Sequence, residues 1–129
     1  MCFACSPQNP IGLHLKFSHE GDICRTTFTA GNEHQGWDGV LHGGLVTTLL
    51  DEAMAQWLWH RGVAAMTAEM LTRFSLPVPV GVPVTVEAWK EGCRGRLWEL
   101  SARLILPGGK VAARATAKFL TVKEKGKES

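Results

Sequence analysis

One helix-forming segment among many strand-forming ones constrains the fold of this chain more than any other feature. Between residues 44 and 60, apolar side chains recur three and four positions apart, which is the period of an α-helix with one buried face. This apolar stripe consists of Val46, Leu49, Leu50, Ala53 and Trp57. Asp51 lies on roughly the opposite side, although a short carboxylate in mid-helix competes for backbone hydrogen bonds. The segment therefore predicts a single amphipathic helix with an unexpected carboxylate on its second face.

Most other segments alternate apolar and polar residues with the period of a β-strand. Two lie before the helix, near residues 11–17 and 24–30, with Glu20 to Asp22 as the turn between them. Four follow, near residues 66–76, 82–88, 98–106 and 111–122, with "EGCRG" and "PGG" among the turns. Residues 31–43 predict a glycine-rich loop. Because short turns join consecutive strands, we predict an α+β fold with an antiparallel sheet of about six strands packed on one helix.

The chain length and the strand pattern after the helix add two expectations. A chain of 129 residues suits a single domain, residues 1–129, with residues 123–129 as a frayed polar tail. In the first strand after the helix, alternation places residues on two faces. One face is expected to hold Met66, Ala68, Met70, Phe74 and Leu76, and the other Thr67, Glu69, Leu71 and Arg73.

The second face of the helix predicts contact with another copy of the chain. Asp51 shares its side with small or apolar residues rather than with a solvated charged set: Gly44, Thr47, Thr48, Met54, Ala55 and Leu58. One sheet buries only one side of a helix, so a second subunit would cover the other. We therefore expect a homodimer, or a dimer of dimers. From the residues alone, three roles stay open for Asp51: it accepts a hydrogen bond from a Thr hydroxyl, forms an ion pair at an interface, or is a functional carboxylate.

Two glycines at the start of the helix indicate a place for developing negative charge. The backbone N–H groups of Gly43 and Gly44 belong to the unsatisfied first turn, at the positive end of the helix dipole. The absence of side chains lets a carbonyl group approach closely, and such N–H groups stabilise an oxyanion. Together with a buriable carboxylate, this arrangement favours a site for acyl transfer.

Composition and missing motifs exclude several functional classes. A formal net charge of +2 without a concentrated basic face argues against nucleic-acid binding. The first residues show no basic start followed by an apolar run, and the helix is too polar to span a bilayer, so we expect a cytoplasmic protein without a membrane partner. Cys2 and Cys5 form a C-x-x-C pair without a second ligand pair, so we expect no metal site. No cofactor is predicted.

The stretch GVLHGGLVTTLLDEAMA, residues 39–55, resembles the hotdog-fold acyl-CoA thioesterases, in the HGG-containing branch related to PaaI-like and 4-hydroxybenzoyl-CoA thioesterases. In that branch a catalytic Asp or Glu follows the motif His by nine residues, which is the spacing from His42 to Asp51. The segments CFACSPQNPIGLHLKF and TAEMLTRFSLPVPVGVPVTVEA also resemble the branch, so the likeness covers nearly the whole chain. It implies a hotdog fold and hydrolysis of an acyl- or aryl-CoA to the free acid and coenzyme A.

The resemblance implies catalytic roles for three residues. The backbone N–H of Gly43 would polarise the thioester carbonyl. Asp51 would act across a dimer interface, either as general base for water or as a nucleophile that forms a mixed anhydride. Thr67 would hold the attacking water.

The remaining expected site residues would position or contact the substrate. His42 and Gly44 belong to the motif at the helix start, with His42 positioning the loop. Several relatives carry Asn or Gln six residues before the motif His, where this chain has Gly36; either Gln35 or His34 takes over that role, or the role is absent. The acyl group is expected near Met54 and Leu58. The candidates for binding the coenzyme A phosphates are Arg73, Arg94 and Arg96.

Two alternative functions stay open from the sequence. The run "DEAMAQ" resembles the helix of hotdog acyl-carrier-protein dehydratases, and such an enzyme would depend on His34 and Glu52 instead of Asp51. A hotdog module that binds acyl-CoA without turnover is the other alternative, because fold does not determine function.

Overall fold

Helix α1, Gly43–His60, forms the centre of the fold in the computed structural model, which describes residues 15–37 and 39–122. All five residues of the predicted apolar stripe are buried. Trp57 also anchors the end of the helix, because its Nε1 donates a hydrogen bond to the carbonyl of Asp22 over 2.7 Å. The predicted helix is confirmed and begins one residue earlier than expected.

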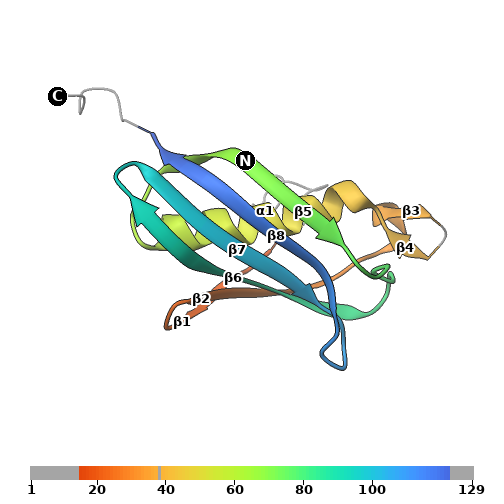
Figure 1. Cartoon of the computed structure of the whole chain (residues 1–129). Helices are drawn as coiled ribbons and strands as arrows, with labels where there is room; N and C mark the ends of the chain where they lie inside the picture. Colours follow the sequence, from red (N-terminus) through yellow and green to blue (C-terminus); the bar gives the residue numbers. More distant parts are fainter. Residues whose placement is uncertain (1–14, 38, 123–129) are drawn as a thin grey trace.

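Six strands build one antiparallel sheet around this helix, in the order β1-β2-β6-β7-β8-β5 (Figure 1). Their bounds are β1 Ser18–Glu20, β2 Ile23–Thr29, β5 Ala65–Phe74, β6 Pro83–Arg94, β7 Leu97–Ile105 and β8 Val111–Thr121. A short 3-10 helix, η1 (Asn32–His34), leads into a separate hairpin of β3 (Gln35–Trp37) and β4 (Val40–Leu41). The predicted α+β architecture is confirmed.

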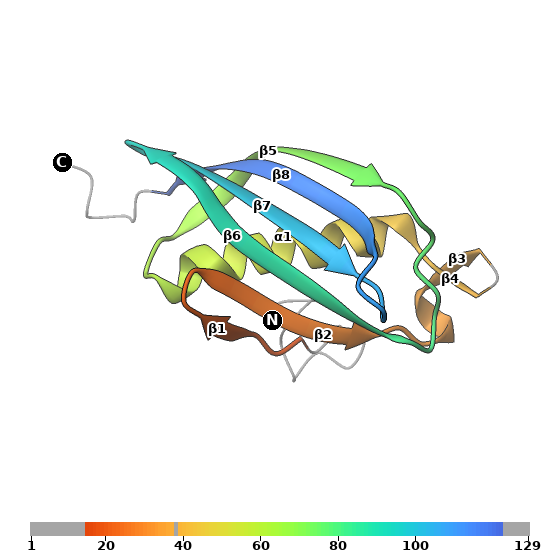
Figure 2. The same ribbon diagram turned by 60° about the horizontal axis from the view of Figure 1, so that its bottom comes forward.

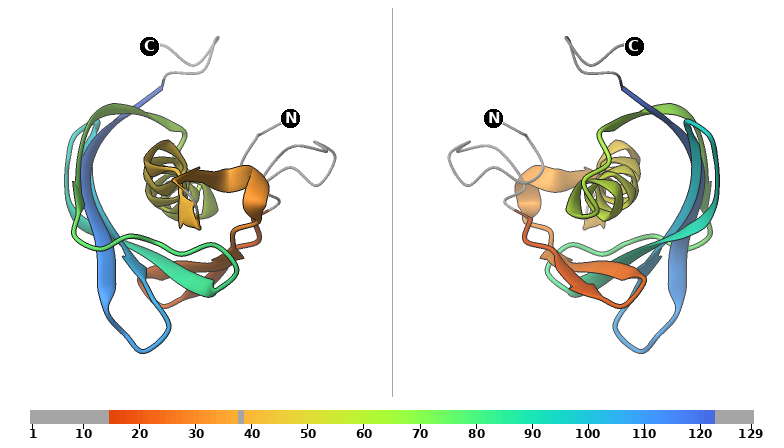
Figure 3. Two further views of the ribbon diagram at one scale, coloured as in Figure 1. Left: turned by 90° about the vertical axis from the view of Figure 1, so that its right-hand side faces the viewer. Right: turned by 90° about the vertical axis from the view of Figure 1, so that its left-hand side faces the viewer.

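The sheet curves so that its concave face holds α1, as Figures 2 and 3 show from below and along the helix axis. Strand alternation directs apolar side chains to this face: Val84, Val86 and Ala88 of β6 are all buried beside the helix. The core is therefore a single layer of side chains between helix and sheet. The convex face carries most of the charged residues of the strands, among them Arg25, Glu87 and Arg103.

Three local expectations need correction. The first strand was expected to include Leu15 and Phe17, but β1 begins only at Ser18; residues 11–14 lie outside the described residues. The segment 31–43 is more ordered than a loop, since it contains η1, β3 and β4. The segment "EGCRG" is largely strand: β6 continues to Arg94, and the chain reverses at Gly95, whose φ of 60° suits glycine.

A β-bulge in β5 reverses the expected faces at the start of that strand. Thr67 pairs with Phe119 and Glu69 with Lys118, so Ala68 is the extra residue. Because Phe119 is buried in the core, Thr67 faces α1, and Met66 faces the convex side. The expected placement of Met66 with Met70 and of Thr67 with Glu69 is therefore wrong. Alternation alone misses the bulge, because an inserted residue leaves no mark in the apolar pattern.

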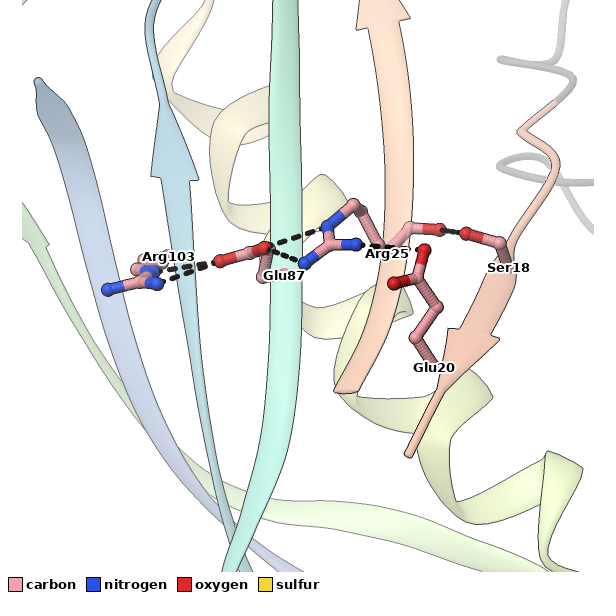
Figure 4. A network of polar contacts seen from close by, with 5 residues as sticks. All are labelled: Ser18, Glu20, Arg25, Glu87 and Arg103. Atoms are coloured by element: carbon pink, nitrogen blue, oxygen red, sulfur yellow. Dashed lines mark hydrogen bonds and ion pairs between the residues drawn. The ribbon is translucent and has the colours of Figure 1, made fainter. Parts of the chain in front are cut away.

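On the convex face, one nearly buried carboxylate joins three strands (Figure 4). Glu87 of β6 accepts hydrogen bonds from Nε of Arg25 in β2 over 2.7 Å and from Nε of Arg103 in β7 over 3.0 Å. Burial by itself would raise the pKa of Glu87, but the two guanidinium groups outweigh it and hold the pKa below its ordinary value of 4.5. The network therefore favours the ionised carboxylate in the folded protein.

Replacing this carboxylate should destabilise the sheet. We expect Glu87→Gln to lower the free energy of unfolding at pH 7 by roughly 1–3 kcal/mol, because two charged hydrogen bonds become weaker. A carboxylate with a lowered pKa stabilises the fold above pH 4.5, and this contribution is lost as the pH falls through the folded pKa. Urea unfolding should thus show a difference between wild type and variant that shrinks from pH 7 to pH 3. A difference independent of pH would contradict the role of Glu87.

Candidate functional site

The first turn of α1 is capped by the side chain and carbonyl of His42. Nδ1 of His42 accepts the N–H of Gly44 over 2.9 Å, and its carbonyl accepts the N–H groups of Leu45 and Val46. A Cβ on Gly44 would lie 2.9 Å from Cε1 of the imidazole, so only glycine leaves room for the cap. His42 therefore acts as the N-cap, in agreement with a positioning role.

Removing this cap should cost stability. We expect His42→Ala to lower the free energy of unfolding by about 1 kcal/mol, because the N–H of Gly44 loses its acceptor. His42→Asn offers a short side-chain oxygen at the same position and should recover most of the loss. Thermal or urea unfolding of the two variants tests this. Equal losses in both would show that packing of the ring, and not capping, is the contribution of His42.

Gly43 differs from the other residues of this turn because its backbone N–H lacks an acceptor in the part of the chain that the structure describes. Among residues 15–37 and 39–122 it has no hydrogen-bond partner, whereas the next three N–H groups are all bonded to His42. Gly43 lines a pocket of about 410 Å³ between the start of α1 and the end of β5, whose other walls are largely apolar. These are Val40, Leu41, Val46, Phe74, Ser75, Leu76, Pro77 and Val78. A free N–H at the positive end of a helix, in an apolar hollow, can stabilise an oxyanion.

Asp51 and Thr67 are brought together by the bulge in β5. The hydroxyl of Thr67 donates a hydrogen bond to Oδ1 of Asp51 over 2.8 Å, joining the middle of α1 to the edge strand of the sheet. Asp51 is half-buried, and Thr67 is exposed. The hydrogen bond fixes one carboxylate oxygen and leaves Oδ2 available to a further donor. Of the roles left open for Asp51, acceptance of a Thr hydroxyl is thus confirmed, and it is compatible with a catalytic role.

Gly43 and Asp51 of one chain are too far apart to act on the same carbonyl group. Eight residues separate them on α1, which is about 12 Å along the helix axis. An oxyanion lies about 3 Å from its N–H donor, and an attacking atom lies within about 3.5 Å of the carbonyl carbon. The single chain therefore holds two separate halves of a potential acyl-transfer site.

The segment before α1 holds one of the two alternatives expected there, His34, in structural contacts. His34 is engaged in structure: its Nδ1 accepts the N–H of Gly31 over 3.0 Å, and its carbonyl accepts the N–H of His42 over 2.8 Å. Its ring also packs against Phe28. A Cβ on Gly36 would lie 3.3 Å from Cα of His42, so the close packing of β3 on the cap accounts for glycine here. Gln35 lies in β3, and its side chain is outside the described part of the structure.

Met54 and Leu58 do not share the accessible face of Asp51. Their side chains are 0% and 1% exposed and belong to the core, so within one chain they offer no surface to a ligand. The helix buries a wider arc than the five-residue stripe, because the curved sheet reaches around it. Glu52, the residue required by the dehydratase alternative, is half-buried and accepts a hydrogen bond from Nε2 of Gln56 over 3.1 Å.

The pocket at Gly43 is the feature that sequence reasoning missed. Phe74, which lines it, was expected on the same strand face as Met70, and its Cε1 would lie 3.9 Å from a Cβ on Gly43. Leu76 was expected in the strand but follows it, because β5 ends at Phe74; Pro77 and Val78, in the next segment, were expected to form a turn. The available signal was a run of apolar residues after an edge strand, which exceeds what a turn requires.

Within the described residues, no helix has the length and apolar character needed to cross a membrane.

The chain is similar to known proteins in both sequence and fold. The family profile of the thioesterase superfamily matches residues 38–113, which include both Gly43 and Asp51. A bovine protein, acyl-coenzyme A thioesterase THEM4 from Bos taurus, is 34% identical over 99 residues, or 75% of this chain. That alignment covers 40% of the bovine protein, so the chain spans about two fifths of the length of this curated relative.

Solved structures share the fold over most of the chain. A thioesterase superfamily protein superposes with a TM-score of 0.86 at 26% identity, covering 91% of this chain and 61% of its own. The Escherichia coli PaaI protein from the phenylacetic acid degradation operon has a TM-score of 0.79 at 20% identity, with 84% and 83% covered. A Streptococcus mutans protein bound to acetyl-CoA has a TM-score of 0.81 at 14% identity, with 92% and 97% covered. The expected hotdog fold is thus confirmed.

Proposed function

Because this chain belongs to the thioesterase superfamily, we propose that it hydrolyses the thioester of an acyl- or aryl-CoA to the free acid and coenzyme A. The unpartnered N–H of Gly43 at an apolar pocket is the observation that carries the proposal. It offers a preorganised donor where a thioester carbonyl becomes an oxyanion. The bovine relative named as an acyl-CoA thioesterase and the fold neighbour bound to acetyl-CoA support the choice of substrate class.

In the proposed reaction the thioester carbonyl oxygen accepts the N–H of Gly43. As general base, Asp51 takes a proton from water, whose oxygen attacks the carbonyl carbon, and the carbon–sulfur bond then breaks to release the thiolate, which takes the proton from Asp51. As nucleophile, Asp51 attacks the carbon itself, and the carbon–sulfur bond breaks to release the thiolate and leave a mixed anhydride, which water hydrolyses in a second step. Thr67 holds Oδ1 of Asp51 in either route, so Oδ2 is the reacting oxygen. Label in the carboxylate of Asp51 after a single turnover in H₂¹⁸O would establish the anhydride route, because the general-base route places the label only in the product acid.

The reaction as proposed requires two subunits, and the free edge of the sheet supplies a surface for the second. Strand β5 is ten residues long and, among the strands that the structure describes, has a neighbour on one side only. It exposes apolar side chains, with Met66 62%, Leu71 59% and Phe74 57% exposed. A long apolar edge of this kind favours pairing with another chain. A two-fold dimer through β5 would bring Gly43 of one subunit toward Asp51 of the other, which the 12 Å separation along one helix prevents within a subunit.

The pocket at Gly43 gives the acyl group an apolar binding site. Its walls contain Phe74, Leu76 and Val78 and no charged residue. We therefore assign the acyl or aryl group to this pocket, in place of the surface expected at Met54 and Leu58.

Thiol release from a panel of aryl-, short-chain and long-chain acyl-CoAs tests the function. Turnover of apolar acyl groups by wild type is expected. The thiols of the four Cys residues of the chain are subtracted with an enzyme-only control. Tight binding of a panel member without any turnover would contradict hydrolysis and identify an acyl-CoA-binding module.

A further inference from the structure

A row of charged residues crosses the convex face of the sheet and is neutralised at only one end. The directly paired residues run from β5 through β8, β7 and β6 to β2, as Arg73, Arg114, Arg103, Glu87 and Arg25. Glu87 binds Arg103 and Arg25 through hydrogen bonds and ion pairs (Figure 4). Arg73 and Arg114, here called the arginine pair, have no hydrogen-bond or ion-pair partner within residues 15–37 and 39–122.

This arrangement costs stability in the absence of an anion. Like charges directly opposite each other in a sheet repel, and Arg114 lies between two other arginines. The residues next to the pair on the same face, Leu71 and Thr116, are neutral. Glu69 is four residues along β5, which is roughly 13 Å, and it binds Lys118 over 3.6 Å. The arginine pair is therefore a site of uncompensated positive charge.

The arginine pair lines a hollow of the right chemistry for a phosphate group. The hollow has a volume of about 310 Å³ and is formed by Leu71, Arg73, Arg114, Ala115 and Thr116. Planar guanidinium groups bind phosphate oxygens through paired hydrogen bonds, and two of them side by side match a doubly charged group. The hydroxyl of Thr116 is a further donor in the same hollow.

The position of the pair relates it to the proposed site. Arg73 and Phe74 are adjacent at the end of β5 and face opposite sides of the sheet, so Phe74 lines the pocket at Gly43 while Arg73 lines the convex hollow. Arg94 and Arg96, the other expected candidates, lie at the far end of the sheet, where Arg96 donates to the carbonyl of Thr121 (Figure 1). We consider a ligand with its thioester at Gly43. If its long arm passes the end of β5, its phosphates would lie at the arginine pair.

We propose that Arg73 and Arg114 bind the phosphate groups of the coenzyme A moiety. This inference rests on the proposed function for its ligand, and the arginine pair is a binding element without a part in the chemical step. It recognises the nucleotide end of the substrate regardless of the acyl group. The affinity for coenzyme A should consequently fall as ionic strength rises.

Calorimetric binding of coenzyme A is the first test, with pantetheine as the probe that lacks phosphates. We expect R73Q/R114Q to weaken coenzyme A binding by roughly 10- to 100-fold, the effect of losing charged hydrogen bonds, and to leave pantetheine binding unchanged. The matched control K90Q/K110Q removes the same charge from exposed positions elsewhere and should bind coenzyme A as wild type does. Removing like-charge repulsion should keep or raise the melting temperature of R73Q/R114Q, so a folding defect would be recognised.

The second test uses kinetics with one acyl group on two carriers. R73Q/R114Q should raise KM for the acyl-CoA at nearly constant kcat, and should leave hydrolysis of the matching acyl-pantetheine unchanged. Coenzyme A binding that is absent in wild type, or equal in wild type and R73Q/R114Q, overturns the inference. Binding that depends on the arginine pair in a protein that hydrolyses nothing would support the inference while refuting the proposed hydrolysis.

Discussion

Asp51→Asn is expected to reduce kcat for thioester hydrolysis by roughly 10²- to 10⁴-fold, whichever catalytic role the carboxylate has. The amide removes the negative charge needed to take a proton or to attack carbon. Its oxygen can still accept the hydrogen bond of Thr67, now 2.8 Å from Oδ1, so the fold and the position of the side chain should be kept. Steady-state kinetics with the best acyl-CoA of the panel measure the loss of kcat, and a melting curve checks that the fold is kept.

Glu52→Gln is the matched control, because it makes the same chemical change one residue further along α1. Glu52 accepts a hydrogen bond from Gln56 on the same helix. Removing the negative charge of Glu52 should change kcat by less than about threefold, as for a change outside the site. Comparable losses in the two variants would exclude Asp51 as the specific catalytic group. A large loss in Glu52→Gln alone would instead favour the dehydratase arrangement.

Gly43→Pro should have the second large effect, a fall in kcat of roughly 10²- to 10³-fold, because proline removes the N–H proposed to bind the oxyanion. The backbone conformation at residues 42 and 43 is compatible with this proline. Gly43 is the first residue of the helix, where proline is well tolerated. His42 before it has φ −57° and ψ 132°, the extended conformation that a following proline requires.

Gly43→Ala separates the N–H from the added bulk. Its Cβ would meet only Cε1 of Phe74, at 3.9 Å, which is an ordinary contact. We expect this variant to retain most of the wild-type kcat and Gly43→Pro to lose it at a similar melting temperature. If alanine is as damaging as proline, access to the pocket, and not oxyanion binding, explains the glycine.

Mixing the Asp51→Asn and Gly43→Pro variants tests whether each site combines Gly43 of one subunit with Asp51 of the other. A dimer of one Asp51→Asn chain and one Gly43→Pro chain contains one intact site if Gly43 and Asp51 act from different subunits. Random pairing should then restore about a quarter of wild-type activity, since half of the dimers are mixed and half of their sites are intact. No recovery after confirmed subunit exchange would place both groups in one subunit's site, or show that a dimer is not needed.

The central helix and the order of the sheet follow from the sequence because each has a strong periodic pattern. The stripe from Val46 to Trp57 has to be buried, and the alternating segments on both sides leave an antiparallel sheet as its only cover. Glycines at the start of the helix and a carboxylate on its second face likewise favoured acyl transfer, and the spacing from His42 to Asp51 resembled that of the HGG-containing thioesterases. These features are local in the chain, so local patterns can reveal them.

Contacts between distant segments account for what could not be predicted. The hydrogen bond between Thr67 and Asp51 depends on the bulge at Ala68, which alternation does not reveal. Met54 and Leu58 are buried because the sheet curves, and curvature is a property of all six strands together. The row from Arg73 to Arg25 exists only through the register of five strands, in segments that are separately unremarkable.

The bulge in β5 also makes the pairing of that strand as important as the identity of its residues. If β5 kept its length but paired without the bulge, Ala68 would lie opposite Phe119 and Thr67 would turn away from Asp51, although every proposed catalytic side chain would still be in the sequence. A substitution scan of the chain would give Ala68 little weight, because its side chain forms no part of the Asp51–Thr67 contact. The position of Thr67 thus depends on how β5 pairs with β8, and not only on which side chains the strand contains.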